Sequence, residues 1–173
     1  MTDHGGFLKQ VRRRAIAEQI RRVLLAEAVL RPHARLAGAG QLGGALSFNG
    51  TSAYVQASKE STYDITGAIT VAAWIKVSSF TIQWQTIVAK GDSAWRLLRY
   101  DVSDALCFAG TNLSPNTVSG TRNVNDGLWH HIVAQKTNEA LEIWFDGTRV
   151  AAFATEPIAG TWVASQPEEI ILL

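Results

Sequence analysis

The sequence predicts an all-β protein in which two antiparallel sheets pack face to face, preceded by an N-terminal amphipathic α-helix. From residue 45 onward, short runs of β-branched and aromatic residues alternate with Asn-Gly, Asp-Gly and Gly-Asp pairs that suit tight turns. No helical periodicity interrupts these runs after residue 42. A hydrophobic content of 47% in 173 residues is enough for one core of ordinary size.

Residues 1–36 predict the helix. Pro32 ends its pattern, because the residue before a proline is disfavoured in the α region. The segment carries a net charge of +5 and the rest of the chain −4, which together give the overall +1. Residues 37–44, rich in Gly and Ala, are predicted to be a linker. Apolar residues recur at helical spacing of three to four, at Leu8, Val11, Ala15, Ile16, Ile20, Val23, Leu24 and Leu30.

Ten strands are predicted after the linker. Strands at this spacing, without intervening helices, require two packed sheets or a barrel. The turn signals between them favour antiparallel neighbours. The predicted strands span residues 45–48, 54–57, 70–77, 86–90, 95–100, 105–109, 129–136, 141–145, 149–154 and 170–173.

Several phrases resemble, in order and spacing, the laminin-G-like jelly roll of the concanavalin A-like superfamily. They are residues 45–55 (ALSFNGTSAYV), 69–76 (ITVAAWIK), 87–92 (IVAKGD) and, most specific, 125–134 with 141–147 (NDGLWHHIVA and LEIWFDG). The resemblance implies a sandwich over residues 45–173. It also implies a non-catalytic module that binds a carbohydrate or a protein, in an extracellular or surface-displayed setting.

Two positions depart from the family's pattern. Asn49 stands where the family usually has an aspartate that helps to bind a structural calcium ion. Asparagine keeps an oxygen but lacks the charge, so Asn49 is a weak calcium candidate. The family's pattern also continues past residues 170–173 into a last strand. We therefore expect a sandwich that lacks this strand and has an open, association-prone edge.

The hydrophobic core is predicted to include several aromatic side chains. Strand alternation places Trp129 and His131 on one face, which we expect to turn into the space between the sheets. Trp74 and Trp144 are predicted to join this core. His130 and His131 point to opposite faces, so they cannot chelate one metal ion together.

Ligand contacts are predicted from aromatic residues in polar, loop-like surroundings. Trp84 and Trp162 lie in such segments, with Arg96, Tyr100 and Asn112 in or near the same loops. Exposed aromatic rings stack on sugar rings in many binding sites. Packing or rim positions are the alternative for the same residues.

Catalysis is not expected. Related glycosidases use carboxylates that flank the scissile bond, and the nearest pair here is Glu142 with Asp146, which are separated by Trp144 and a turn. A glycoside hydrolase is therefore the third hypothesis. The sequence also shows no Cys/His cluster and no phosphate-binding glycine loop, and predicts no cofactor other than calcium.

A glycan- or protein-binding module is thus the leading functional hypothesis, and a structural or virion-display protein without a glycan ligand is the alternative. We expect a homo-oligomer or larger assembly through the N-terminal helix or the open sheet edge. The acidic balance of the sandwich favours docking of the basic helix over nucleic-acid or membrane contact. The chain shows no signal peptide and no apolar run long enough for a transmembrane helix.

Overall fold

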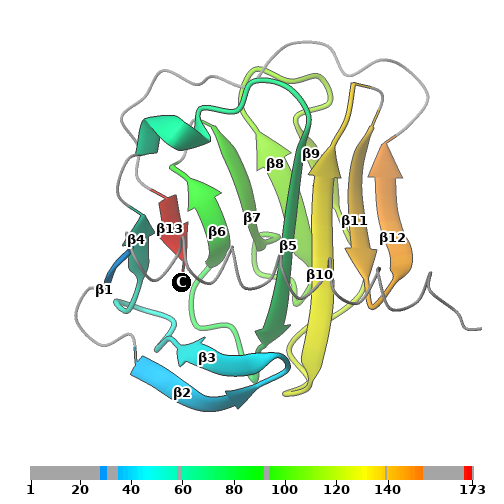
Figure 1. Cartoon of the computed structure of the whole chain (residues 1–173). Coiled ribbons are helices and arrows are strands. Elements are labelled where there is room, and N and C mark those ends of the chain that lie inside the picture. The colour runs from blue at the N-terminus through cyan, green and yellow to red at the C-terminus, as the bar shows by residue number, and fades with distance from the viewer. Residues whose placement is uncertain are drawn as a thin grey trace, which may run out of the picture.

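The computed structural model describes residues 28–30, 35–57, 60–91, 94–138, 140–153 and 170–172. It confirms the all-β sandwich, with two antiparallel sheets facing each other (Figure 1). In the described part of the chain, no helix has the length and apolar character of a membrane span.

The larger sheet has seven strands in the order β1-β4-β13-β6-β7-β8-β9, and the smaller has four in the order β12-β11-β10-β5. A separate hairpin, β2–β3, lies beside one end of the sandwich (Figure 1). A short 3₁₀ helix, η1, spans Glu60–Tyr63. The strands are β1 (Ala28–Leu30), β2 (Arg35–Gly40), β3 (Gly43–Ser47), β4 (Val55–Ala57), β5 (Ile69–Lys76), β6 (Thr86–Lys90), β7 (Trp95–Arg99), β8 (Leu106–Gly110), β9 (Thr117–Ser119), β10 (Trp129–Lys136), β11 (Leu141–Phe145), β12 (Thr148–Phe153) and β13 (Ile170–Leu172).

The ten predicted strands are all present, each within two residues of its expected bounds. Three further strands were not predicted, namely β1, β2 and β9. The strand at residues 170–172 is paired on both sides, with β4 and with β6. The sheet is therefore continuous at this position.

The N-terminal segment differs from expectation where it meets the described residues. The helix predicted over residues 1–36 lies mostly outside them and stays a prediction. Within them, Ala28–Leu30 pairs with β4 and Arg35–Gly40 pairs with β3. The segment predicted as a linker is largely a hairpin, and Gly43, where the chain leaves the turn and β3 begins, has a φ of 115°. Glycine populates this region without a steric penalty, so a Gly-rich run forms a tight turn as readily as a hinge.

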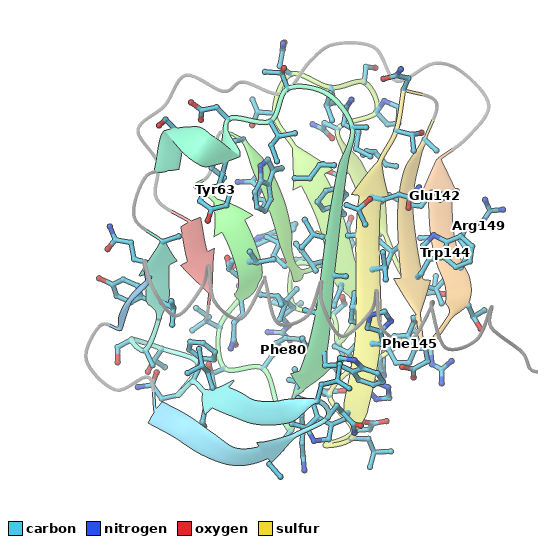
Figure 2. The ribbon with its side chains drawn as sticks, in the orientation of Figure 1. Tyr63, Phe80, Glu142, Trp144, Phe145 and Arg149 are labelled. Carbon is cyan, nitrogen blue, oxygen red and sulfur yellow. The ribbon has the colours of Figure 1, made fainter. Side chains whose placement is uncertain are left out.

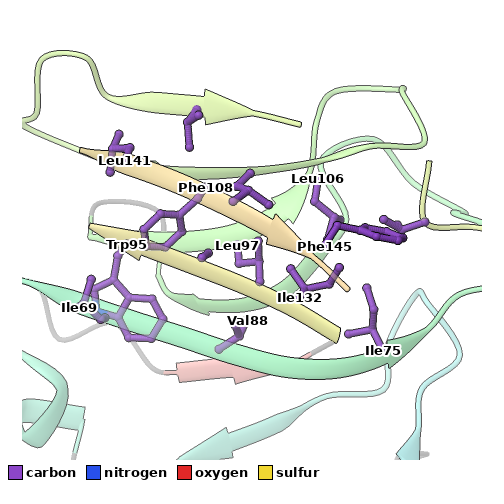
Figure 3. Close-up of a cluster of buried hydrophobic side chains, with 14 of the residues drawn as sticks. Ile69, Ile75, Val88, Trp95, Leu97, Leu106, Phe108, Ile132, Leu141 and Phe145 are labelled. Atoms are coloured by element: carbon purple, nitrogen blue, oxygen red, sulfur yellow. The ribbon is translucent and has the colours of Figure 1, made fainter. Parts of the chain in front are cut away.

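The core fills the space between the two sheets (Figure 3). The side chains of Leu97 and Phe108, from the larger sheet, and of Ile132 and Leu141, from the smaller, are fully buried. Each such side chain contributes roughly 1.5–3 kcal/mol through its removal from water. Trp95 is the buried tryptophan of this core.

The predicted core aromatics lie elsewhere, and this prediction is wrong. Trp74 is 41% exposed, and Trp129, His131 and Trp144 are only partly buried. In β10 the buried positions are His130, Ile132, Ala134 and Lys136, so Trp129 and His131 occupy the outward face.

The physical reason is that both faces of β10 carry a mixture of polar and apolar residues. Alternation fixes which residues share a face, but it does not say which face is inward. The choice depends on whether His130 finds partners when it is buried. Its ring nitrogens do find them: Nδ1 lies 2.8 Å from Asp146 and Nε2 lies 2.9 Å from Asp126.

Candidate ligand-binding site

Two of the predicted ligand-contact residues are brought together. The rings of Trp84 and Tyr100 meet edge to face, with their centroids 5.6 Å apart. Trp84 is 44% exposed and Tyr100 is 41% exposed. They lie on two loops, before β6 and after β7, at one end of the larger sheet.

The other predicted contacts do not converge on this pair. Arg96 is half-buried within β7. Asn112 follows β8 and so lies at the opposite end of the β7–β8 hairpin from Tyr100, because Trp95 pairs with Gly110. Trp162 lies outside the described residues.

Backbone hydrogen bonds fasten the two aromatic loops to each other. The amide of Trp84 donates to the carbonyl of Asp101 at 3.1 Å, and the amide of Arg99 donates to the carbonyl of Gln85 at 2.8 Å. The side-chain amide of Gln83 donates to the carboxylate of Asp101. The loops therefore hold the two rings in a fixed relation.

The side chain of Arg99 forms hydrogen bonds with both of these loops. Its guanidinium donates to the carbonyl of Ile82 at 2.9 Å and to that of Ser103 at 2.6 Å, and it also donates to the carbonyl of Val102. It lies 5.0 Å from the centroid of the Phe80 ring. One guanidinium thus binds three carbonyls of the loops. Because the loops are already ordered, less conformational entropy is lost when a ligand binds.

The backbone of this site is strained. Trp84 and Asp101 have φ angles of 55° and 54°, in the left-handed region. For a bulky residue such as tryptophan this conformation costs on the order of 1 kcal/mol, and such residues cluster at functional sites. At Trp84 the strained backbone supports an indole that is exposed to solvent, so the strain does not serve core packing.

A cleft of about 370 Å³ adjoins Tyr100, between the edge strands β9 and β12. Each of these two strands lies at the edge of its sheet, so each leaves backbone donors and acceptors available along this side. The cleft combines hydroxyl groups with small apolar side chains. Its lining residues are Tyr100, Thr117, Val118, Ser119, Val150, Ala151 and Ala152.

The cleft residues on β9 were not found from the sequence. The run Thr117–Ser119 is only three residues long and has one apolar side chain, Val118, so it gives no recognisable strand period. Its pairing with β8 is what identifies it. The β-branched pair Thr117 and Val118 was the one available signal.

The weak calcium candidate, Asn49, holds a turn in the structure. Its side-chain oxygen accepts hydrogen bonds from the backbone amides of Thr51, Ser52 and Ala53 at 3.1, 2.9 and 2.9 Å. Among the described residues there is no group of three or more His, Cys, Asp or Glu side chains arranged to hold a metal ion.

The carboxylates of Glu142 and Asp146 have separate partners. Glu142 accepts hydrogen bonds from Trp144 Nε1 at 3.3 Å and from Arg149 at 2.8 Å. Asp146 is bonded to His130 and to the backbone amide of His131. Neither carboxylate lines the cleft, so this pair does not flank a substrate there as glycosidase carboxylates do.

The two-sheet jelly roll has a counterpart among known families. A laminin G family model, described as the concanavalin A-like lectin/glucanases superfamily, matches residues 49–169. The chain belongs to this superfamily. No curated protein matches the chain.

Solved structures show the same fold. The chain is similar to the binding domain of Paraclostridial Mosquitocidal Protein 1, with a TM-score of 0.58, 11% identity, and coverage of 83% of this chain and 41% of that one. It is similar to domain 4 of AbnA, a GH43 extracellular arabinanase from Geobacillus stearothermophilus solved with arabinotriose, with a TM-score of 0.56, 18% identity, and coverage of 84% and 72%. It also resembles the binding domain of botulinum neurotoxin serotype C1, with a TM-score of 0.54, 13% identity, and coverage of 84% and 41%. The chain thus spans less than half the length of either toxin domain.

Proposed function

We propose that this domain is a non-catalytic carbohydrate-binding module, working outside the cell or on a surface. Its site consists of the Trp84–Tyr100 pair and the adjoining cleft between β9 and β12. The observation that carries the proposal is the exposed, strained and rigidly braced Trp84 beside Tyr100. Large aromatic rings held at a surface in this way suit a ligand with apolar faces.

The chemistry of the site matches a sugar. The C–H face of a sugar ring stacks on an aromatic face, while its hydroxyl groups need both donors and acceptors. The hydroxyls of Tyr100 and Ser119 offer both, and the hydroxyl of Thr117, which donates to the side-chain oxygen of Asn116 at 3.1 Å, can still accept. A cleft of 370 Å³ falls within the usual range of small-ligand sites, roughly 300–1,000 Å³. Because the site is open, we expect a Kd near 0.1–1 mM for a short glycan, about −4 to −5.5 kcal/mol.

The comparisons support this ligand class. The superfamily takes its name from lectins and glucanases. Domain 4 of AbnA was solved with arabinotriose, and two other similar structures are binding domains of toxins.

A protein ligand is the second candidate. Ile82 and Val102, on the same two loops as the aromatic pair, are 43% and 65% exposed. These aliphatic side chains extend the aromatic surface and suit a protein partner better than a sugar. A protein ligand would therefore contact Val102 as strongly as it contacts Trp84.

The test is a glycan-array screen followed by calorimetry with the best glycan. We expect Trp84→Ala to weaken binding at least about fivefold, because a stacked aromatic ring contributes about 1 kcal/mol or more. Val102→Ala should leave glycan affinity within twofold, and Leu42→Ala, at a side chain that is 78% exposed on the β2–β3 hairpin, is the matched control. Array binding that is unchanged by Trp84→Ala would overturn the proposed site, and no binding to any glycan would overturn the function.

A further inference from the structure

The outward face of the four-stranded sheet carries a second group of aromatic side chains. Trp74 from β5, Trp129 and His131 from β10, and Trp144 from β11 all lie on this face. None of them lines the cleft or belongs to the core. Aromatic side chains that gather on one outward face are typical of a binding surface.

Strand register sets the positions of these rings. Trp74 is paired with His131, and Trp144 is paired with Val133 two residues farther along β10. Trp74 and Trp144 are therefore separated by two strand spacings and two residues. This geometry places their Cα atoms about 12 Å apart. A trisaccharide bridges such a span, whereas a single sugar does not.

Both tryptophans are held in place by neighbours. The rings of Trp74 and His131 lie 5.1 Å apart at an interplanar angle of 40°. Trp144 Nε1 donates to Glu142, which in turn accepts from Arg149. Figure 2 shows Glu142, Trp144 and Arg149 gathered on β11 and β12. The two indoles are thus preorganised before any ligand arrives.

The polar groups around Trp144 favour a neutral ligand. Glu142 is only 12% exposed at its side chain and is ion-paired with Arg149, which is 52% exposed. The carboxylate is thereby neutralised, and the guanidinium keeps N–H groups that can donate to a hydroxyl. Between the two indoles the pair Ala72–Val133 continues the face, and the pair Thr70–Gln135 follows beyond Trp144, so the side chains there are small or uncharged. A neutral, hydroxyl-rich chain matches this mixture of rings, amides and hydroxyls better than an aliphatic protein surface does.

We propose that this face is a second carbohydrate-binding site, which takes a neutral oligosaccharide of three or more residues running from Trp74 across β10 to Trp144. The proposal shares its ligand class with the proposed function but uses none of the cleft residues. Two such sites on one domain would raise the avidity for long or clustered glycans.

The experiment uses the full chain with Trp84→Ala, which removes the first site, and titrates it by calorimetry with neutral xylo-, arabino- and cello-oligosaccharides of one to five residues. We expect binding in at least one series, with affinity rising at least tenfold between the disaccharide and the trisaccharide. Adding Trp144→Ala or Trp74→Ala should lower trisaccharide affinity at least tenfold. Trp144→Phe should restore most of it, because a ring face is retained.

Lys76→Ala, on the same outward face, is the matched control and should change affinity by less than twofold. Circular dichroism and thermal melts check that every variant is folded. If Trp84→Ala alone abolishes binding to every length, the sheet-face proposal fails and the cleft proposal stands. If the Trp74 and Trp144 variants abolish binding in the chain with Trp84 intact, the cleft fails and the sheet face stands. Binding that is insensitive to all three substitutions, or absent altogether, overturns both.

Discussion

His130 and Asp146 form a hydrogen bond of 2.8 Å at one end of the sandwich, where His130 is 5% exposed. The other ring nitrogen of His130 is bonded to Asp126, whose carboxylate also accepts the amide of Leu128. Residues 125–134 and 141–147, the two most specific phrases of the sequence, thus meet at a buried histidine between two acids. The cluster ties the loop before β10 to the β11–β12 turn.

This cluster predicts a defined pH dependence of stability. Burial disfavours the charged form of His130, but hydrogen bonds to Asp146 and Asp126 outweigh it, so the pKa of His130 is raised above 6.5. The stabilisation is therefore full below pH 6.5 and is lost as the pH rises through the folded-state pKa.

The two acids set the lower limit of the window. The amide of Leu128 and the ring of His130 lower the pKa of Asp126 below 3.8. For Asp146, burial acts in the opposite direction, but hydrogen bonds from His130 and the amide of His131 still lower its pKa below 3.8. Their stabilisation is present above pH 3.8 and is lost as the pH falls through the folded-state pKa values.

We therefore expect the cluster to stabilise most between about pH 4 and pH 6.5. Urea denaturation from pH 3 to pH 9 measures the free energy of unfolding. His130→Gln should flatten the decline above pH 6.5, whereas His131→Gln, on the outward face, should keep it. Equal pH profiles for the wild type and His130→Gln would contradict this assignment.

Side chains on the inward and outward faces of β10 should contribute differently to the free energy of unfolding, so truncating them to alanine should have different effects. Ile132→Ala removes a fully buried side chain and should cost about 2–4 kcal/mol of unfolding free energy. Val133→Ala, on the outward face, should cost about 1 kcal/mol or less. Denaturant melts compare the two neighbours directly, and a larger loss for Val133→Ala would reverse the assignment of the faces.

The single cysteine provides a probe of native packing. Burial raises the pKa of the Cys107 thiol to about 12, partly offset by Arg96. At pH 8 this lowers the thiolate fraction by roughly a thousandfold relative to an exposed thiol. We expect Ellman's reagent to react only slowly with the native protein and fully within minutes in 6 M guanidinium. Rapid stoichiometric labelling without denaturant would contradict the burial of Cys107.

The strained backbone at Trp84 predicts that a substitution which relieves the strain keeps or raises the stability of the protein but abolishes ligand binding. Trp84→Gly removes the penalty of a φ near 55° and should raise the free energy of unfolding, or leave it within about 1 kcal/mol, while glycan binding is lost. Trp84→Ala keeps the strained backbone and serves as the comparison. A glycine variant clearly less stable than the alanine variant would show that the backbone there is not strained.

The sequence predicted the fold because its strands are short, regular and separated by turn residues. The bounds of β6, β10 and β11 were predicted to the residue, since each is enclosed by clear turn signals. In contrast, β1 and β9 are three residues long, and neither is long enough to show a repeated alternation of apolar and polar residues. Such strands are identified by their pairing partners, which no local pattern encodes.

The candidate site was predicted only in part, for a similar reason. Trp84 was found because it lies in a polar, loop-like segment, and Tyr100 because the strand predicted over residues 95–100 ends near the same loops. Their contact depends on the hydrogen bonds from Trp84 to Asp101 and from Arg99 to Ile82, each of which joins residues 17 apart in the sequence. The outward position of Trp74 was missed because a tryptophan within a regular strand resembles a core residue, and hydrophobicity alone does not give the direction of the face.

The most direct test of the central claim is a two-dimensional ¹H–¹⁵N NMR titration of the full chain with the glycan that the array selects. The six tryptophan indole N–H signals report on separate parts of the molecule. Carbohydrate binding at the proposed site predicts shifts of the Trp84 indole and of the amides of Tyr100, Thr117 and Ser119, while the buried Trp95 signal stays unchanged. Signals that do not move at saturating glycan, or that move only at residues remote from both aromatic surfaces, would contradict the account.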